Sequence, residues 1–382
     1  MTEQPLPQNA VKIPTLDIII PRHNEPEGLI VNALNSIAGQ VGFNFRLLRV
    51  TIADDHSDTK LNENFLKMFP FEIQYLYAPE NKGPGCTRQM GIDHTTNDII
   101  TFIDADDRFF SCITLLEVYR FIMQNMVKPW TVVSTQWLEE NTLNNQYNLI
   151  PHQANMVWTH GKFYRRAFLD KMGIRFHSSL RLFEDMYFNK QVVLLSAPDE
   201  HLYCPSITYF WASNPNSLTR KNSDKKAYLW TYCDDFIYSA DEVMKILTSK
   251  NCERRHEIII NSIALYYYSI QTASFLDGSA ETKQKLDKIN AEAYRLITTY
   301  KESFEKLPMI AKSQFINAAR EECKTHFNFM TELYTWSDWL HSLDKQFGPA
   351  GSTAAFDIAN LRYETTDNAI GVLPQNLTGA GQ

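Results

Sequence analysis

The chain has no excess of basic residues. Its 382 residues include 37 Lys and Arg against 44 Asp and Glu, which gives a formal net charge of -7 at pH 7. Proteins that bind nucleic acid over a broad surface normally carry a clustered basic excess, because their ligand is a dense row of phosphates. The composition therefore disfavours an extended nucleic-acid interface, although a local basic groove is compatible with it.

Cysteine pairs and long apolar runs are also absent. No two cysteines have the Cys-x-x-Cys spacing, which argues against a zinc site or a disulfide framework and favours a reducing compartment. No segment approaches the roughly 18 consecutive apolar residues that a membrane span needs, and residues 1–14 are polar. We therefore expect a soluble, cytoplasmic protein without a transmembrane segment. The six cysteines are Cys86, Cys112, Cys204, Cys233, Cys252 and Cys323.

The first third of the chain alternates short apolar runs with segments of helical spacing. Strands are predicted at residues 17–20, 47–53, 73–77 and 99–103, and helices at 28–38 and 86–94. This βαβ alternation predicts a largely parallel sheet with right-handed crossovers. Loops rich in Pro, Asn, Asp and Gly follow the strands, so we expect them to converge on one edge of the sheet.

The later part of the chain changes character. Residues 130–209 continue the mixed α/β pattern, with a strand at 131–134 and a helix at 165–172, whereas 228–247, 255–275, 281–304 and 312–343 are predicted helices. Aromatic runs at 266–268 and 334–339 could stack on sugars or bases, but their helical spacing is more typical of core residues, and we assign them to the core. We predict a polar segment at 1–14, an α/β domain at 15–220, a helical accessory domain at 221–348 and a Gly/Ala/Thr/Asn-rich tail at 349–382.

Three carboxylates follow the predicted strand at 99–103, namely Asp104, Asp106 and Asp107. Burying an unpaired carboxylate is costly, so such a cluster usually holds a hard cation such as Mg²⁺ or Mn²⁺ through oxygen ligands. Ligands of open α/β sheets also bind at the carboxyl ends of strands. A solvated acidic turn that caps the next helix is the alternative, and the three residues alone leave both interpretations open.

Six motifs, in order over about 200 residues, resemble those of the family 2 glycosyltransferases, which have the GT-A fold and use nucleotide-sugar donors. Gln89 replaces the Asn that the family usually has in the third motif. The motifs are Ile18-Ile19-Ile20-Pro21-Arg22-His23-Asn24-Glu25, Asp54-Asp55-His56-Ser57, Asn81-Lys82-Gly83 with Arg88-Gln89-Met90-Gly91, Asp104-Ala105-Asp106-Asp107, Phe183-Glu184-Asp185, and the segment 209–219 that ends Asn216-Ser217-Leu218-Thr219.

The resemblance implies a GT-A, Rossmann-like, mostly parallel sheet domain followed by an all-α C-terminal domain. It implies a Mn²⁺ or Mg²⁺ site at Asp106 and Asp107, with His160 as a third ligand, a phosphate contact or a structural histidine. Asp55 would bind the uracil imide, and Arg88 would contact phosphate or orient the acidic cluster. The expected nucleotide-binding residues are Pro21, His23, Asn24, Glu25, Asp54, Asp55, Asn81, Gly83, Arg88, Asp104 and Ala105.

The same resemblance makes Asp185 the catalytic base, with Glu184 as the other member of the pair. Inverting transfer requires a carboxylate that takes the proton from the acceptor hydroxyl. Two acids that precede a helix at 186–195 also suit an ordinary helix N-terminus, which favours negative charge.

The resulting expectation is a metal-dependent, inverting glycosyltransferase. The donor is expected to be a UDP-sugar, although Arg22 and His23 depart from the family in the loop that borders the base. The acceptor hydroxyl belongs to a glycan, a protein or a modified DNA base, and the net charge disfavours DNA. The alternative is a catalytically inactive module that binds a nucleotide-sugar or serves assembly.

Overall fold

The structure is a computed structural model, and it describes residues 12–143, 146–154, 157–180, 182–214, 225–271, 279–327 and 336–348. The chain forms two compact units. The first comprises Met1–Arg181 and Ser196–Ser213, and the second comprises Leu182–Leu195 and Asn214–Gln382. The chain therefore enters the second unit twice. Residues 182–195 belong to it, residues 196–213 return to the first unit, and the rest of the chain belongs to the second unit.

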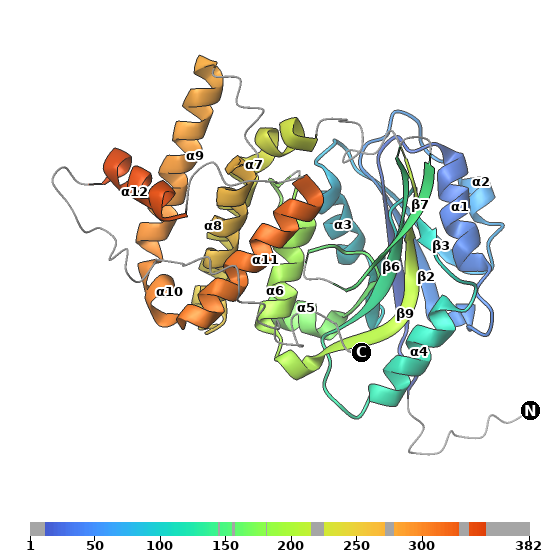
Figure 1. The fold of residues 1–382 in the computed structure, drawn as a ribbon. Coiled ribbons are helices and arrows are strands. Elements are labelled where there is room, and N and C mark those ends of the chain that lie inside the picture. The colour runs from blue at the N-terminus through green and yellow to red at the C-terminus, as the bar shows by residue number, and fades with distance from the viewer. Residues whose placement is uncertain are drawn as a thin grey trace, which may run out of the picture. The chain divides into compact units, whose positions relative to one another are not determined.

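The first unit is built on one sheet, which contains nine strands among the described residues (Figure 1). The spatial order is β3-β2-β1-β4-β8-β6-β9-β5, and β7 pairs with β6. Strands β3, β2, β1 and β4 are parallel to one another, β8 is antiparallel to β4 and β6, and β9 is parallel to β6. The strands are β1 Leu16–Arg22, β2 Leu48–Asp54, β3 Glu72–Tyr77, β4 Ile99–Phe102, β5 Arg108–Phe109, β6 Val132–Leu143, β7 Gln146–His152, β8 Lys162–Arg165 and β9 His201–Trp211.

Helices cover both faces of this sheet. Figure 1 shows α1 and α4 on one face and α3 and α5 on the other. The α-helices of this unit are α1 Glu27–Ala38, α2 Glu63–Leu66, α3 Pro84–Asp93, α4 Thr114–Asn125 and α5 Arg166–Met172, and two short 3₁₀ turns lie at Phe45–Leu47 and Pro198–Glu200.

Successive side chains of a strand point to opposite faces of the sheet, so neighbouring residues of β1 pack against different helices. Ile18 and Ile20 of β1 pack in the same apolar cluster as Ile30 and Leu34 of α1. Ile19 points to the other face, where a Cβ on Gly91 of α3 would lie 2.4 Å from Ile19 Cγ2. Because only glycine allows this approach, α3 lies close against β1, and its first turns are fixed near the carboxyl ends of the strands.

The predicted fold class is confirmed: a GT-A-like sheet with a parallel half precedes a helical region. The strand predicted at 131–134 is the start of the much longer β6, while β8 and β9 were not predicted. Strand β9 was missed because its exposed and buried positions do not alternate regularly, so it carries no period-2 signal.

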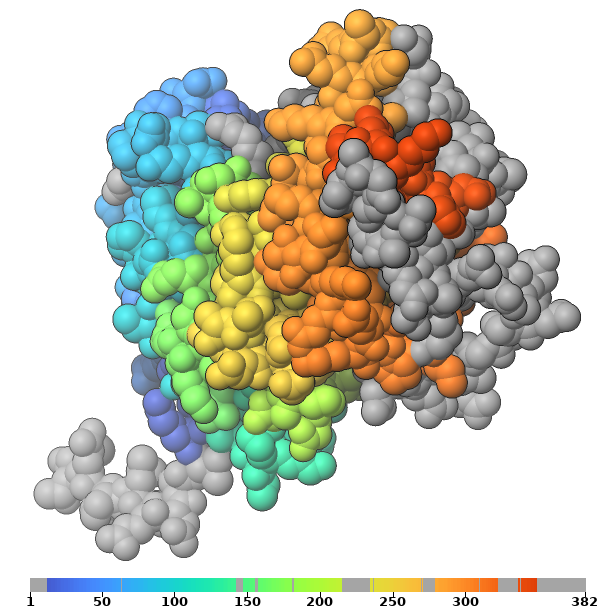
Figure 2. Space-filling view, turned by 90° about the vertical axis from the view of Figure 1, so that its left-hand side faces the viewer, coloured from blue at the N-terminus to red at the C-terminus, as the bar shows by residue number. Residues whose placement is uncertain are grey.

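The second unit is helical in its described part. Its helices are α6 Glu184–Leu195, α7 Lys225–Ser249, α8 Arg255–Gln271, α9 Ala280–Thr299, α10 Lys301–Lys306, α11 Met309–Phe327 and α12 Trp336–Phe347. The predicted helix 281–304 is divided at Tyr300, which separates α9 from α10. Figure 2 shows α8 (yellow) and α9 (orange) side by side on one face.

Aromatic side chains form the interior of this unit. Tyr266, Tyr267 and Tyr268 of α8 are buried, as are Trp336 and Trp339 of α12. The rings of Tyr267 and Trp336 meet edge to face with centroids 5.0 Å apart. The assignment of these aromatic residues to the core is therefore confirmed for the described positions.

Several predicted features lie outside the described residues. These are residues 1–11 of the polar N-terminal segment, the motif residues 216–219, positions 334 and 335 of the aromatic run, and the tail at 349–382. Within the part of the chain that is described, no helix combines the length and apolar character that crossing a membrane requires.

Candidate active site

Asp54, at the end of β2, is a fully buried carboxylate that fixes the strand-end loops. It forms an ion pair with Arg22, accepts a 2.7 Å hydrogen bond from the Tyr75 hydroxyl, and accepts a 2.8 Å bond from the Ser57 amide. Burial alone would raise its pKa, but the bonds from Tyr75, Ser57 and Arg22 together keep the pKa of Asp54 below its ordinary value. Asp54 is thus an ionised residue whose oxygens hold the loops together.

Asp55 joins the loop after β2 to the loop before α3. Its two carboxylate oxygens accept bonds from the amides of Lys82 (2.8 Å) and Gly83 (2.7 Å), and the residue is only 4% exposed. Gly83, with φ +92°, occupies the N-cap position of α3. Asp55 therefore positions the start of α3, and its remaining lone pairs are the ones left for a ligand.

His23, Asn24 and Asn81 complete this group of loops. His23 Nδ1 donates to the Asp55 carbonyl (2.9 Å), and the Asn81 side-chain amide donates to His23 Nε2 (2.9 Å). Asn24 has φ +65°. Its backbone amide donates to Ser57 Oγ, and its side-chain Oδ1 accepts from the backbone amide of Asp58, both at 2.8 Å. The loops after β1, β2 and β3 do converge on one edge of the sheet, as predicted.

Arg88 of α3 reaches the acidic cluster. Its guanidinium bonds Asp104 Oδ1 at 2.7 Å, and the Asp104 amide donates to Tyr209 Oη at 3.2 Å. Burial would raise the pKa of Asp104, but the charge of Arg88 and the contact with His160 hold it well below its ordinary value. Asp104 is therefore an ionised carboxylate whose orientation Arg88 sets.

Asp107 is buried next to two other acids. It accepts a 2.5 Å bond from the Tyr209 hydroxyl and a 2.8 Å bond from the Ala212 amide. Burial and the charges of Asp106 and Asp104 nevertheless raise the pKa of Asp107 well above its ordinary value. Without a cation, this carboxylate is thus an unfavourable place for negative charge.

Glu25 belongs to the same electrostatic environment. Its carboxylate accepts a 2.5 Å bond from the His23 amide. Burial, together with the charges of Asp106 and Asp104, raises the pKa of Glu25 to about 7. The predicted nucleotide edge and the acidic cluster are therefore adjacent.

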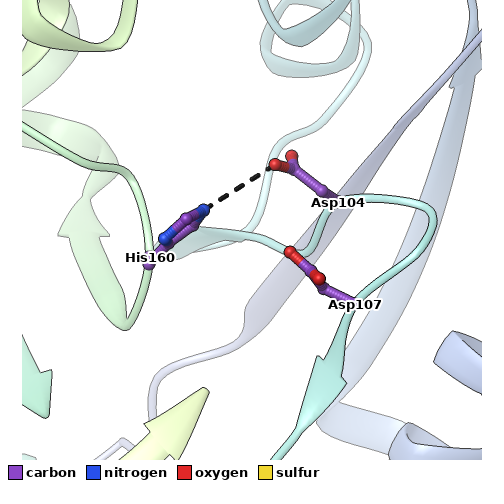
Figure 3. A group of neighbouring side chains, drawn as sticks. All are labelled: Asp104, Asp107 and His160. Carbon is purple, nitrogen blue, oxygen red and sulfur yellow. Dashed lines mark ion pairs between the residues drawn. The ribbon is translucent and has the colours of Figure 1, made fainter. Parts of the chain in front are cut away.

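His160 completes a group with Asp104 and Asp107, and Figure 3 shows the three side chains converging from two loops. One donor atom from each lies within 4.8 Å of the others, and His160 Nε2 lies 3.8 Å from Asp104 Oδ2. Burial lowers the pKa of His160, which favours the neutral imidazole that binds metals. His160 Nδ1 is buried without a hydrogen-bond partner among the described residues.

The backbone next to His160 is tightly held. Gly161 has φ +61°, and a Cβ there would lie 2.4 Å from Thr135 Oγ1. Thr135 also donates to the Gly161 carbonyl through its amide and its hydroxyl, both at 2.9 Å. The His160 position therefore depends on β6, which supplies Thr135.

These residues fit a small divalent cation. Two carboxylates and a neutral imidazole are hard or borderline donors of the kind that Mn²⁺ accepts, and Mg²⁺ accepts the carboxylates. The group contains Asp104, which the family resemblance places at the nucleotide, and it does not include Asp106, which is half-buried beside it. The remaining predicted residues of this edge, Pro21 and Ala105, lie in β1 and in the acidic turn respectively.

An aromatic cluster that was not predicted surrounds His160. The imidazole stacks on Tyr209 at 4.5 Å and on Trp158 at 5.6 Å between ring centroids, and it also contacts Trp137 and Trp211. Of these four aromatic residues, Tyr209 and Trp211 lie in the sixth motif, the segment 209–219. Their joint position depends on the pairing of β6 with β8 and β9, which no local pattern indicated.

Glu184 and Asp185 form the first turn of α6, in the helical unit. Phe183, just before them, has φ +60°, a strained conformation for a bulky residue. Glu184 is buried at 6% exposure, whereas Asp185 is half-buried. Of the two acids, Asp185 is thus the more accessible to a ligand.

Comparison with known proteins identifies the sheet unit. Residues 17–180 match the sequence profile of Glycosyl transferase family 2. A GalNAc(5)-diNAcBac-PP-undecaprenol beta-1,3-glucosyltransferase of Campylobacter jejuni is 31% identical over 102 residues, which cover 26% of this chain and 32% of that protein. Polypeptide N-acetylgalactosaminyltransferase 10 of Rattus norvegicus is 29% identical over 97 residues, covering 24% and 16%. The matched segment spans a third or less of these two relatives.

Solved structures extend the similarity over more of the chain. A crystal structure of S. aureus TarS in complex with UDP matches with a TM-score of 0.58 at 16% identity, covering 81% of this chain and 88% of that one. A second, in complex with UDP-GlcNAc, has a TM-score of 0.56, the same identity and the same coverage. At this identity the match establishes a shared fold. Residues 17–180, which carry the strand-end loops and the acidic cluster, therefore form a domain that matches glycosyl transferase family 2, in agreement with the resemblance seen in the motifs.

Proposed function

We propose that this chain is a metal-dependent, inverting glycosyltransferase that uses a nucleotide-sugar donor, with UDP as the nucleotide. The observation that carries the proposal is the convergence of Asp104, Asp107 and His160 beside the loops after β1, β2 and β3, within a family 2 domain. The shared fold with TarS, which has been crystallised with UDP and UDP-GlcNAc, supports the choice of nucleotide.

In this proposal the strand-end loops bind the nucleoside. Asp55 is held by two backbone amides and offers its remaining lone pairs to the base, while Asp54 and Arg22 keep the loop in place. Asn81 and His23 form the exposed rim of the same edge. Because these contacts are made alike in the ground state and the transition state, they contribute uniform binding and leave the chemical step unchanged.

Asp104, Asp107 and His160 would hold the cation. A divalent ion bound there would neutralise the charge that develops on the leaving diphosphate. Arg88 fixes the orientation of Asp104, and Tyr209 fixes that of Asp107 through its hydroxyl. Asp106 remains a proposed ligand at the half-buried edge of the cluster.

Asp185 is the proposed general base. It would accept the proton of the acceptor hydroxyl while that oxygen attacks the anomeric carbon, which inverts the configuration. Its partial exposure, compared with the buried Glu184, supports the choice between the two acids. Glu184 would then act by positioning its neighbour.

The acceptor is proposed to be a hydroxyl of a glycan, a protein or a modified DNA base. The names of the curated relatives include one enzyme of a polyprenol-linked glycan and one polypeptide glycosyltransferase. The net charge of -7 disfavours the nucleic acid. A cytoplasmic location is part of the proposal, because the cysteines have no spacing typical of a disulfide framework.

A donor screen tests this function. UDP-, GDP-, CMP- and dTDP-sugars are added to the protein with MnCl₂ or with EDTA, and the melting temperature is measured. A ligand at 100 times its Kd should stabilise the native state by about 2.7 kcal/mol. We expect UDP-sugars to stabilise only in the presence of Mn²⁺, and stabilisation that persists in EDTA would contradict the role of the metal.

The same donors separate an enzyme from an inactive binding module. Release of free UDP from a stabilising UDP-sugar, measured with a coupled assay over a panel of glycan and peptide acceptors, is expected for the enzyme. Tight, Mn²⁺-dependent binding without UDP release under any of these conditions would favour the inactive module.

A further inference from the structure

Two partly exposed indole rings lie beside the candidate metal site. Trp158 and Trp211 have ring centroids 5.5 Å apart, and each is half-buried. Trp158 stacks on His160 at 5.6 Å with the ring planes 18° apart, and Trp211 lies 5.4 Å from the same imidazole. The exposed aromatic surface therefore borders the group that would hold the cation.

A second layer supports these two rings from behind. Trp137 is 2% exposed and contacts Trp158 at 6.2 Å and Trp211 at 5.9 Å. Trp137 in turn stacks on His152 at 3.8 Å, and His152 is paired with Glu139 at 2.9 Å. Aromatic rings that pack against one another and are backed by the hydrogen-bonded His152 have few rotamers left, so the exposed faces are preorganised.

The order of the strands places this aromatic surface opposite the nucleoside edge. The proposed base and ribose contacts follow β1, β2 and β3, whereas Asp104 and Asp107 follow β4. Trp137 and Trp211 belong to β6 and β9, and Trp158 precedes β8, on the far side of β4 in the sheet order. A nucleotide-sugar whose base lies at the first group and whose diphosphate lies at the second therefore directs its sugar toward the third.

We propose that Trp158 and Trp211 form a platform that binds a pyranose ring. The negative face of an indole attracts the weakly positive C–H groups on one face of a sugar, and the apolar contact excludes water from the reacting centre. This inference rests on the proposed function and names the substrate group next to the metal. The ring belongs either to the donor's transferred sugar or to a sugar of the acceptor.

Binding measurements on matched variants test the platform. Trp158→Ala and Trp211→Ala remove one ring each, and Trp158→Phe keeps an aromatic face. Phe110→Ala, at a residue that is 44% exposed and outside the cluster, is the control for loss of a surface aromatic. Calorimetry with UDP and with UDP-GlcNAc in MnCl₂ then compares a ligand without a sugar to the same ligand with one.

If the platform holds the donor's sugar, both Ala variants should bind UDP-GlcNAc with about tenfold lower affinity than the wild type, whereas their affinity for UDP should stay within about twofold. Trp158→Phe should have an intermediate affinity for UDP-GlcNAc. If it holds the acceptor's sugar, UDP and UDP-GlcNAc are both unaffected. Methyl glycosides of glucose, galactose, GlcNAc or GalNAc should then quench the tryptophan fluorescence of the wild type and of Phe110→Ala, but not that of the Ala variants.

The proposal is overturned if the Ala variants respond like the wild type to every one of these ligands, or if their affinities for UDP and for UDP-GlcNAc fall to the same extent. The second result would mean that the rings only support the fold of the site. Failure of the proposed function looks different, because the wild type itself would then bind neither UDP nor UDP-GlcNAc. The glycoside quenching still tests the platform in that case.

Discussion

At the scale of single residues, the site contains carboxylates whose pKa values are shifted in opposite directions by their surroundings. Asp54 is stabilised as an anion by Arg22, Tyr75 and Ser57, and Asp104 by Arg88. Burial and neighbouring acids act in the opposite direction on Asp107 and Glu25. The first two residues therefore hold the local structure, while the last two carry negative charge at a cost that a bound cation would reduce.

Asp107→Asn should weaken Mn²⁺-dependent binding of a UDP-sugar by roughly 10- to 100-fold without destabilising the fold. The amide keeps an acceptor for the Ala212 amide and removes the repulsion from Asp106 and Asp104, so the melting temperature in EDTA should not fall. Calorimetry with Mn²⁺ measures the first effect and thermal unfolding in EDTA the second. Asp93→Asn, at an exposed carboxylate paired with Arg175, provides the same charge change elsewhere. Full affinity in Asp107→Asn would remove this residue from the metal site.

Glu25 should make the metal-free protein less stable as the pH rises. Its pKa is about 7 in the folded state and 4.5 ordinarily, so the folded state retains a proton that the unfolded chain has lost. The stability that this group contributes is present below pH 4.5 and is lost as the pH rises through 7. Urea unfolding in EDTA measures this effect. Between pH 5 and pH 8, the free energy of unfolding of the wild type should fall by on the order of 1–3 kcal/mol relative to that of Glu25→Gln. Parallel pH curves for the two proteins would contradict this.

At the scale of elements, each part of the site depends on a close approach between backbone segments. Gly91 lets α3 lie against Ile19 of β1, which brings Arg88 to Asp104. Gly161 lets the turn before β8 lie against Thr135 of β6, which brings His160 to the same carboxylate. The two glycines therefore set the distance between the acidic turn and its basic partners.

Gly161→Ala should cost more stability than Gly173→Ala. Both residues have φ near +60°, so a side chain is strained at either position by about 1–2 kcal/mol. A Cβ at Gly161 would also meet Thr135 Oγ1 at 2.4 Å, whereas a Cβ at Gly173 meets nothing within 4 Å. Denaturant unfolding gives the difference between the two variants, and Mn²⁺ titration should show weaker binding in Gly161→Ala alone. Equal effects would mean that the turn before β8 relaxes without moving His160.

At the scale of the whole molecule, the proposed functions are divided between the two units. The strand-end loops, the acidic turn and the aromatic cluster all belong to the sheet unit, and Asp185 belongs to the helical unit. Donor binding and transfer should therefore respond differently to substitutions in the two units.

Asp185→Asn should lower transfer by about 10² to 10⁴ while donor and metal affinity stay nearly unchanged, because a general base acts only as the acceptor loses its proton. Glu184→Gln should affect the chemical step less and the stability more, since Glu184 is the buried member of the pair. Transfer rates and calorimetry on the same preparations measure both. The anomeric configuration of the product, read from NMR coupling constants, should be opposite to that of the donor. Retention, or full activity in Asp185→Asn, would rule out this mechanism.

The parallel half of the sheet could be predicted from the amino-acid sequence alone, because its strands and helices have regular apolar periods and their loops contain the motif residues. The order of those motifs along the chain also indicated the family that residues 17–180 match, because motif order can be read without any knowledge of contacts. Asp104 and Asp107 could be named as an acidic cluster for the same local reason.

The contacts that these residues make could be seen only in the folded chain. Asp55 accepts hydrogen bonds from Lys82 and Gly83, Asp107 accepts one from Tyr209, and His160 stacks on Tyr209, and the residues in these contacts lie 27 to 102 positions apart in the chain. The contacts of Tyr209 with Asp107 and His160 depend on strand pairing in the irregular half of the sheet, where the burial pattern of β9 does not alternate. Local periodicity reports which side of an element is buried, but the partner that buries it is set by the fold as a whole.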